Sequence, residues 1–340
     1  MQIRIADSGD QDIWDAYVLK HPEGLAYHLY AWKLAVEKAY GFHGIYLIAE
    51  NSGCVCGVLP LIEFKIPFRP TTFVSLPYCD VAGPLADKPE ISSGLLNFAA
   101  DYAQRKDGSC HIRQISTTSE TSGSGINKVR MILPLPDSSE ALMNGFKAKL
   151  RSQVRKPERD GFWSKTGGFE LLDDFYQVFS LNMRDLGSPV HSFKWIQTIM
   201  ASFGEHAMMA VVYTPENVPV AAGIILCHIK TVSIPWASSL RDYNRLNPNM
   251  LLYWTFLSYA ADHGYSYFDF GRSTPEEGTY RFKEQWGAKP VRLDWSDLPA
   301  KPSGNGGESS VRQIVESIWR KLPLGIANFL GPKVRRYVSL

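Results

Sequence analysis

The stretch that decides the fold runs from Tyr265 to Pro290 and reads YSYFDFGRSTPEEGTYRFKEQWGAKP. Apolar residues alternate over 265–270, which predicts a strand. Gly271 breaks this alternation, and Thr274 is followed by Pro-Glu-Glu. That order is typical of a helix start, with Thr as the N-cap, Pro at the first helical position and Glu at the third. We therefore expect a strand, then a helix that begins at Thr274 and ends at Trp286.

This strand and helix would bring charged side chains together. Asp269 and Arg272 come from the strand end, and Lys283 lies on the helix on a face shared with Tyr280. A helix N-terminus beside an arginine and a lysine predicts an anion-handling site. The alternative is an ordinary strand end followed by a packing helix, with Phe282 on its buried side. Asp-Phe-Gly is also the metal-binding triplet of protein kinases, but no glycine-rich loop, strand lysine or catalytic-loop pattern precedes it, so we do not expect a kinase.

Composition places the chain among globular proteins. It has 340 residues, 45% hydrophobic and 21% charged, which is enough for two domains. No apolar run approaches the roughly 18 residues of a membrane helix, and the N-terminus does not resemble a signal peptide. The five cysteines are scattered and give no zinc spacing, so we expect free thiols, no metal and a cytoplasmic location.

The periodicity predicts a repeated order of elements. The expected helices cover 10–20, 27–40, 90–106, 138–165, 171–186, 192–203 and 249–263, and the expected strands cover 45–50, 54–66, 71–76, 110–115, 128–133, 207–213, 218–228, 230–238 and 290–295. Val74–Tyr78 resembles Val232–Trp236 at an offset of 158, and Tyr102 falls on Tyr259 at an offset of 157. We infer an internal duplication. The second copy carries the strand and helix around Asp269, so it is predicted to be the chemical one, and the first a scaffold.

This order of elements is that of the GNAT acyltransferase fold, and the chain resembles FemAB-like proteins, which carry two GNAT-like domains. It is most similar to the subgroup associated with exopolysaccharide and PEP-CTERM sorting systems, with a BioF2-like acetyltransferase domain. The resemblance rests on Arg155–Arg159, Met183–Gly187, Ile234–Ser239, Phe268–Ser273 and Tyr280–Gly287. It implies an α/β fold with two tandem GNAT-like domains, each a mixed sheet flanked by helices, plus an amphipathic C-terminal tail. It also implies that Phe282 and Lys283 belong to the active site.

The predicted domains follow from these patterns. They are an N-terminal GNAT-like domain at 1–137, a basic helical connector at 138–168, a C-terminal GNAT-like domain at 169–300, and a linker and basic amphipathic tail at 301–340. The tail has a Gly/Ser-rich linker over Lys301–Ser310 and an apolar stripe over Val311–Leu322. This stripe would dock on the protein's own body or lie on an anionic membrane surface.

The connector predicts an anionic ligand. Seven Lys/Arg residues lie between Lys147 and Lys165, against two acidic residues. Arg151, Arg155 and Arg159 share one helix face, and Lys156 adjoins it. Such a face suits a diphosphate or a tRNA backbone, and a solvated linker helix is the alternative.

Residues 239–249 are the predicted donor loop. GNAT enzymes that use acyl-CoA carry a glycine-rich signature in this loop, and it is absent here. Arg241 and Arg245 would bind phosphate through their side chains, ahead of a helix N-terminus capped by Asn247 and Pro248. A purely structural loop is equally compatible with the sequence.

Two further residues complete the predicted site. Arg184 would face the cleft or form a surface pair with Asp185, and Trp236 would stack on a sugar or be an ordinary buried aromatic. Asp269 is the candidate to position or deprotonate the acceptor amine, and Lys283, with Tyr280 beside it, would stabilise the oxyanion.

The resemblance implies an N-acyltransferase that acts on an amine of a cell-envelope or exopolysaccharide precursor, either a glycan or a lipid-linked one. The donor would be acyl-CoA or aminoacyl-tRNA, used as a co-substrate, with no tightly bound cofactor. The alternative is a non-catalytic module that binds tRNA or a polyanionic glycan. Peripheral attachment to the inner membrane through the tail is a further expectation.

Overall fold

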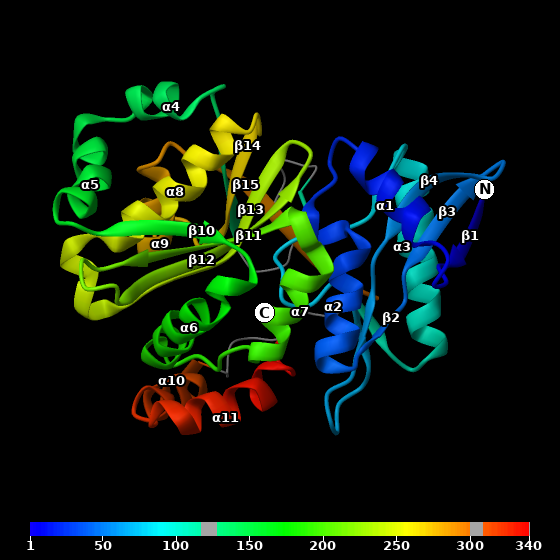
Figure 1. The fold of residues 1–340 in the computed structure, drawn as a ribbon. Helices are drawn as coiled ribbons and strands as arrows, with labels where there is room; N and C mark the ends of the chain where they lie inside the picture. The colour runs from blue at the N-terminus through cyan, green and yellow to red at the C-terminus, as the bar shows by residue number, and fades with distance from the viewer. Residues whose placement is uncertain (117–127, 300–308, 340) are drawn as a thin grey trace. The chain divides into compact units, whose positions relative to one another are not determined.

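A computed structural model describes residues 1–116, 128–299 and 309–339, with the side chains of 309–312 outside the description (Figure 1). The chain forms two compact units. Unit 1 comprises Met1–Arg130, Val291–Gly304 and Tyr337–Leu340, and unit 2 comprises Met131–Pro290 and Asn305–Arg336. Of the described C-terminal residues, 309–336 group with unit 2 and 337–339 with unit 1. None of the described helices is long and apolar enough to cross a membrane.

Unit 1 is built on two groups of strands. One sheet has the order β1-β3-β4-β7, and the other strands follow the order β15-β8-β6-β5-β2. The strands are β1 (Gln2–Ile5), β2 (His43–Gly44), β3 (Leu47–Asn51), β4 (Cys54–Leu59), β5 (Ile62–Phe64), β6 (Thr72–Val74), β7 (Leu85–Ala86), β8 (Ser109–Ile115) and β15 (Lys289–Leu298). The helices are α1 (Gln11–Lys20), α2 (Tyr30–Tyr40) and α3 (Pro89–Arg105). The face of α3 with Leu95, Ala99 and Ala103 packs into a core shared with Leu47 and Phe73.

Unit 2 has one sheet with helices on both faces. Its strands follow the order β10-β11-β12-β13-β14-β9. They are β9 (Val129–Pro134), β10 (Trp163–Gly167), β11 (Ala207–Tyr213), β12 (Pro219–His228), β13 (Thr231–Ser239) and β14 (Tyr267–Ser273). The helices are α4 (Ser139–Gly145), α5 (Ala148–Arg159), α6 (Leu172–Leu186), α7 (Phe193–Phe203), α8 (Pro248–Asp262), α9 (Gly278–Glu284), α10 (Ser309–Arg320) and α11 (Leu324–Arg335). Figure 1 shows α8 on one face of the sheet and α6 on the other, with α10 and α11 beyond α6.

The strand registers confirm the duplication. In unit 1, β6 and β8 are parallel, and Val74 lies opposite His111. In unit 2, β13 and β14 are parallel, and Val232 lies opposite Phe268. One helix precedes the second strand of each pair, α3 in unit 1 and α8 in unit 2. The two sequence offsets, 158 and 157, therefore map one strand pair onto the other, and the predicted fold class of two tandem GNAT-like domains with an amphipathic tail is confirmed.

Two local predictions were wrong. The helical segment expected over 138–165 divides into α4 and α5, and the chain then turns at Gly161, which has a φ of 83°, into strand β10. The helix expected from Thr274 begins only at Gly278, because Glu276 adopts a left-handed φ of 68° and the residues before it form a turn. The linker predicted at Lys301–Ser310 falls mainly on 300–308, which lie outside the described residues.

Candidate active site

The candidate site begins where β13 and β14 stop pairing. Their parallel register covers Thr231 to Ser233, with Ser233 opposite Asp269. Both strands then continue, to Ser239 and to Ser273. The hydroxyl group of Ser233 is buried and has no hydrogen-bond partner within the described part of the chain. Since buried hydroxyl groups are normally paired, this end of the strand pair has unused hydrogen-bonding capacity.

At the corresponding position of unit 1 the serine hydroxyl is hydrogen-bonded. Ser75 is the counterpart of Ser233 at the offset of 158, and its Oγ accepts a hydrogen bond from the backbone N–H of Arg113 at 2.7 Å. The guanidinium of Arg113 donates to the backbone carbonyl of Ser339 at 3.1 Å, and that carbonyl also accepts the N–H of Tyr78 at 2.7 Å. The C-terminal residues of the chain thus fill the first copy, and the two copies differ at their corresponding strand ends.

Lys283 is fixed by the backbone of β14. Its side chain is 8% exposed, and its ammonium donates hydrogen bonds to the carbonyl oxygens of Gly271 at 3.1 Å and Arg272 at 2.8 Å. Consecutive carbonyls of a regular strand point in opposite directions. Gly271 has a φ of 73°, a conformation that favours glycine, and this turn allows both oxygens to meet one ammonium. The helix carrying Lys283 has seven residues and begins at Gly278, and the anion site expected at its N-terminus stays a prediction.

Asp269 is buried and stabilises the turn at Gly271. Its carboxylate is 2% exposed, and Oδ1 accepts a hydrogen bond from the backbone N–H of Gly271 at 2.9 Å. This bond holds the turn whose carbonyl meets Lys283. The geometry therefore joins Asp269 and Lys283 through Gly271, but it does not present the carboxylate to solvent.

Aromatic side chains pack around α9. Phe282 is half-buried and lies edge-on to Tyr253 of α8, with ring centroids 5.0 Å apart. Tyr253 also stacks on Phe270 of β14. Burial raises the pKa of the Tyr253 hydroxyl, so this ring remains neutral. Tyr280 is half-buried on the same short helix.

The predicted basic groups come together at the start of α8. Lys156 of α5 donates a hydrogen bond to the backbone carbonyl of Arg245 at 2.9 Å and forms an ion pair with Asp160 at 3.1 Å. The side chains of Arg155, Arg159, Arg241 and Arg245 are exposed. Arg151 instead donates to the carbonyl of Phe146 at 2.7 Å and ties α5 to the end of α4. The connector and the donor loop, distant in sequence, thus form one basic surface, which we call the α5–α8 basic surface.

The cap predicted for α8 is different in the structure. The helix does begin at Pro248, after Asn247. However, Asn247 has a left-handed φ of 59°, and its side chain makes no capping hydrogen bond. The expected side-chain cap was therefore wrong.

Two other sequence-based candidates lie away from the strand ends. Arg184 donates to Asp185 at 2.6 Å and lies at the connection between α10 and α11, where it meets the carbonyl of Leu322. Trp236 is buried and lies edge-on to Trp195 at 6.3 Å. The contacts of Arg184 match the surface-pair alternative and those of Trp236 match the buried-aromatic alternative, while their roles in a cleft stay predictions.

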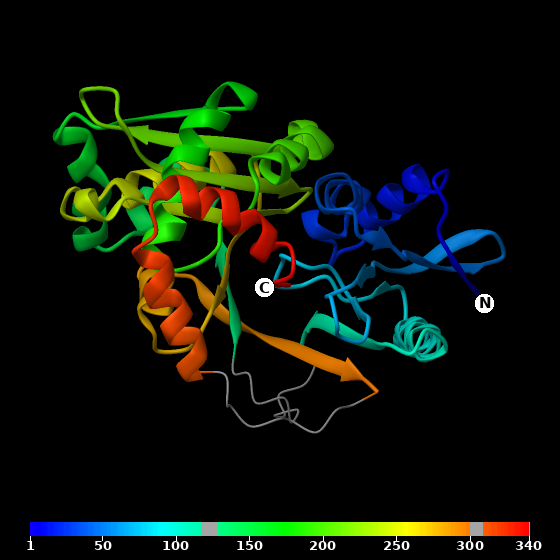
Figure 2. The ribbon, with the colours of Figure 1, turned by 90° about the horizontal axis from the view of Figure 1, so that it is seen from below.

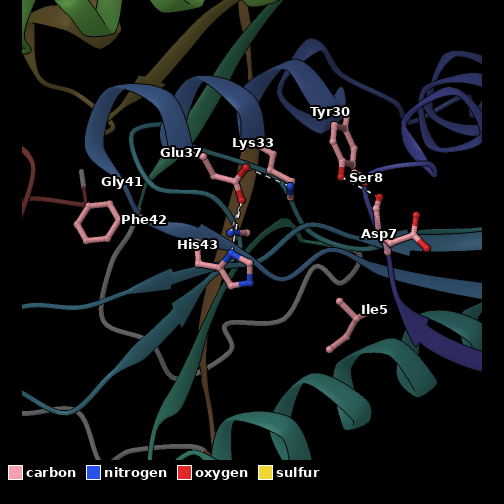
Figure 3. Close-up of a pocket in the computed structure, with 11 residues that line it drawn as sticks. Ile5, Asp7, Ser8, Tyr30, Lys33, Glu37, Gly41, Phe42 and His43 are labelled. Carbon is pink, nitrogen blue, oxygen red and sulfur yellow. Dashed lines mark hydrogen bonds and ion pairs between the residues drawn. The ribbon is translucent and has the colours of Figure 1, made fainter.

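A pocket of about 490 Å³ lies in unit 1 (Figure 3), and no residue of the predicted site lines it. Lys33 of α2 contacts Glu37 at 3.2 Å, and Glu37 also accepts the N–H of Gly44 at 2.9 Å. Glu37 therefore offsets the charge of Lys33 and joins α2 to β2. All the residues that line this pocket belong to unit 1.

Sequence reasoning missed Ser233, Gly271 and Tyr253. Ser233 had a visible signal, because it is matched with Ser75 within the repeat Val74–Tyr78. The function of Gly271 as a turn and the contacts of Tyr253 had no comparable signal, since both depend on packing between distant segments.

Known proteins resemble this chain in sequence over part of unit 2 and in fold over most of its length. Residues 144–284 match the family described as an acetyltransferase (GNAT) domain, a range that contains every predicted site residue. The crystal structure of FemX covers 93% of this chain and 100% of its own, with a TM-score of 0.68 and 16% identity. The chain thus contains a segment similar to GNAT domains and shares the fold of FemX, a FemAB-like fold.

Other structures share this FemAB-like fold. The C-terminal domain of a putative lysylphosphatidylglycerol synthetase from Agrobacterium fabrum covers 92% of this chain and 97% of its own, with a TM-score of 0.56 and 14% identity. A tandem GNAT protein from the clavulanic acid biosynthesis pathway covers 89% and 100%, with a TM-score of 0.54 and 11% identity. At these identities the likeness shows the fold. A search of curated protein sequences finds no significant match.

Proposed function

We propose that this protein is an N-acyltransferase whose unit 2 transfers an acyl or aminoacyl group to an amine of a cell-envelope precursor. One observation carries the proposal. The Ser75 hydroxyl of the first copy is bonded across the strand pair, whereas the corresponding Ser233 hydroxyl of the second copy is buried without a partner. This difference supports a ligand site in the second copy, at the end of the β13–β14 pairing, on the strand that Lys283 contacts.

The reaction would use few protein groups. The amine nitrogen attacks the carbonyl carbon of a thioester or ester, the C–N bond forms, and the carbonyl oxygen becomes an oxyanion. The oxyanion then collapses and expels the thiolate or alkoxide, while the amine loses a proton. An activated donor needs mainly orientation and charge stabilisation. Lys283 would supply that charge, because its ammonium is already fixed at the end of β14.

Asp269 is proposed as a positioning residue. Its carboxylate holds Gly271, and the Gly271 carbonyl in turn holds Lys283. A buried carboxylate that is bonded to its own turn is poorly placed to accept a proton from an incoming amine. This assignment replaces the general-base role suggested by the sequence.

The donor is proposed to be bound by side chains. The α5–α8 basic surface would meet the phosphates of CoA or of the tRNA end through Arg155, Arg159, Arg241 and Arg245. Because the glycine-rich loop is absent, we expect weak acetyl-CoA binding by calorimetry and further weakening in Arg241→Ala with Arg245→Ala. A sub-micromolar acetyl-CoA complex that survives both substitutions would rule out this donor site.

The experiment that tests the function is a comparison of envelope precursors. Mass spectrometry of glycan and lipid-linked precursors, with and without the gene, should reveal a mass difference equal to one acyl or aminoacyl group on an amine. Complementation with Lys283→Met should fail to restore the modified precursor, although the protein accumulates. Unchanged precursors in the deletion strain would contradict the proposal.

A second candidate function is binding of tRNA or a polyanionic glycan without catalysis. It is favoured by the low exposure of Asp269 and Lys283, together with the exposed arginines of the α5–α8 basic surface. Filter binding of unacylated tRNA, repeated at several salt concentrations, separates the two candidates. Tight binding with a steep salt dependence and no precursor modification would favour this module.

A further inference from the structure

The last two helices are docked on unit 2 through one side only. Trp319 of α10 and Ala327 of α11 are buried, and both helices contact α6. Gly331 of α11 lies so close to Val190 that a Cβ atom there would be 3.0 Å from the Val190 backbone nitrogen. Arg335 donates to His191 at 3.0 Å. These contacts fix the orientation of α10 and α11 on unit 2; the two helices are drawn in orange and red in Figure 2.

That surface is apolar on both helices. We define the tail face by six large side chains that are each about half exposed: Ile314, Val315 and Ile318 on α10, and Ile326, Phe329 and Val334 on α11. At the angular step of an α-helix, about 100° per residue, Ile326, Phe329 and Val334 fall within an arc of about 140° and so share one side of α11. Exposed apolar side chains are common singly, but six of them on two consecutive helices that both pack on α6 indicate a binding surface.

The segment that carries the tail face is positively charged, with Lys321 and Lys333 exposed and Arg335 on the docked side. Between Gln313 and Arg336 the sequence has five Lys/Arg residues (320, 321, 333, 335 and 336) and one acidic residue, Glu316, a net charge of +4. Lys333 lies over the Phe329 ring, with its ammonium 3.8 Å from the ring centroid. The aliphatic part of the Lys333 side chain thus covers apolar surface, while its ammonium group lies at the edge of the tail face.

We propose that the tail face binds the surface of an anionic phospholipid membrane. Apolar side chains with lysines at their edge match the boundary between acyl chains and negatively charged headgroups. A second copy of the chain fits less well, because lysines are depleted in the cores of protein interfaces, and Lys333 would be buried with Phe329. The inference does not depend on the proposed reaction.

The test is sedimentation of the full-length protein with vesicles. We expect binding to vesicles of phosphatidylcholine with one third phosphatidylglycerol, and little binding to pure phosphatidylcholine. Ile318→Glu with Phe329→Glu should lower the partition coefficient at least tenfold. These side chains are 58% and 64% exposed, so the fold should be retained. The matched control is Ile229→Glu with Val218→Glu, two apolar residues of unit 2 that are 57% and 41% exposed, and it should bind as the wild type does.

A charge variant gives an independent measurement. Lys321→Glu with Lys333→Glu should reduce binding to the anionic vesicles and leave the melting temperature unchanged, since both side chains are exposed. The proposal is overturned if the wild type does not sediment with anionic vesicles, or if the control pair loses as much binding as the tail-face pair. It is also overturned if sedimentation velocity without lipid shows a dimer that Ile318→Glu with Phe329→Glu dissociates.

Discussion

The ammonium of Lys283 donates a hydrogen bond to the backbone carbonyl of Arg272 at 2.8 Å, and through it α9 is joined to the end of β14. Lys283, which the sequence suggested for its charge, therefore also stabilises the fold. Its replacement should lower stability as well as activity, because a buried carbonyl that loses its hydrogen-bond donor destabilises the folded state.

Lys283→Met is expected to affect both stability and turnover. The carbonyls of Gly271 and Arg272 lose their donor, which should lower the free energy of unfolding by about 1–3 kcal/mol. Loss of the charge should lower kcat by about 10²–10³ with KM nearly unchanged, measured on the acceptor found by mass spectrometry and well below the melting temperature. A folded variant that keeps most of its turnover would remove Lys283 from the active site.

Asp269→Asn and Asp269→Ala separate positioning from base catalysis. An asparagine oxygen can still accept the N–H of Gly271, so the Asn variant should keep at least a tenth of the wild-type kcat, and the Ala variant should lose far more. A general base would give a different result, since Asn and Ala would then be equally inactive. Equal losses of kcat in the two variants would therefore support general-base catalysis by Asp269.

Ser75→Ala and Ser233→Ala form a matched pair between the two copies. Removing the Ser75 hydroxyl deletes the bond to the Arg113 N–H and should cost about 1 kcal/mol, seen as faster hydrogen exchange over β8. Removing the Ser233 hydroxyl deletes no bond, so the exchange of β14 should stay the same or slow down. Equal destabilisation of both units would mean that the Ser233 hydroxyl is hydrogen-bonded as the Ser75 hydroxyl is.

His191 should make unit 2 sensitive to acid. Burial, and secondarily the charge of Arg335, hold the pKa of His191 well below its ordinary value of 6.5. The unfolded chain then binds a proton that the folded chain does not, so stability is full above about pH 6.5 and falls as the pH decreases. His191→Gln should reduce the slope of unfolding free energy against pH below 6.5, by up to about 1.4 kcal/mol per pH unit. Urea denaturation at several pH values measures it, and an unchanged slope would contradict the assignment.

The sequence by itself determined the order of the elements, the duplication and the amphipathic tail. These properties are local or periodic: the helical spacing of Ile314, Val315 and Ile318, the alternation before Gly271, and the correspondence of Val74 with Val232 are all visible in one dimension. The tertiary structure decided which groups meet. Lys156 and Arg245 lie 89 residues apart, and only the packing of α5 on α8 brings them together. The start of α9 was decided by the left-handed φ of Glu276, which no propensity rule favours. Likewise, the sequences around Ser75 and Ser233 are similar, and only the position of the neighbouring strand determines that one hydroxyl is bonded and the other is not.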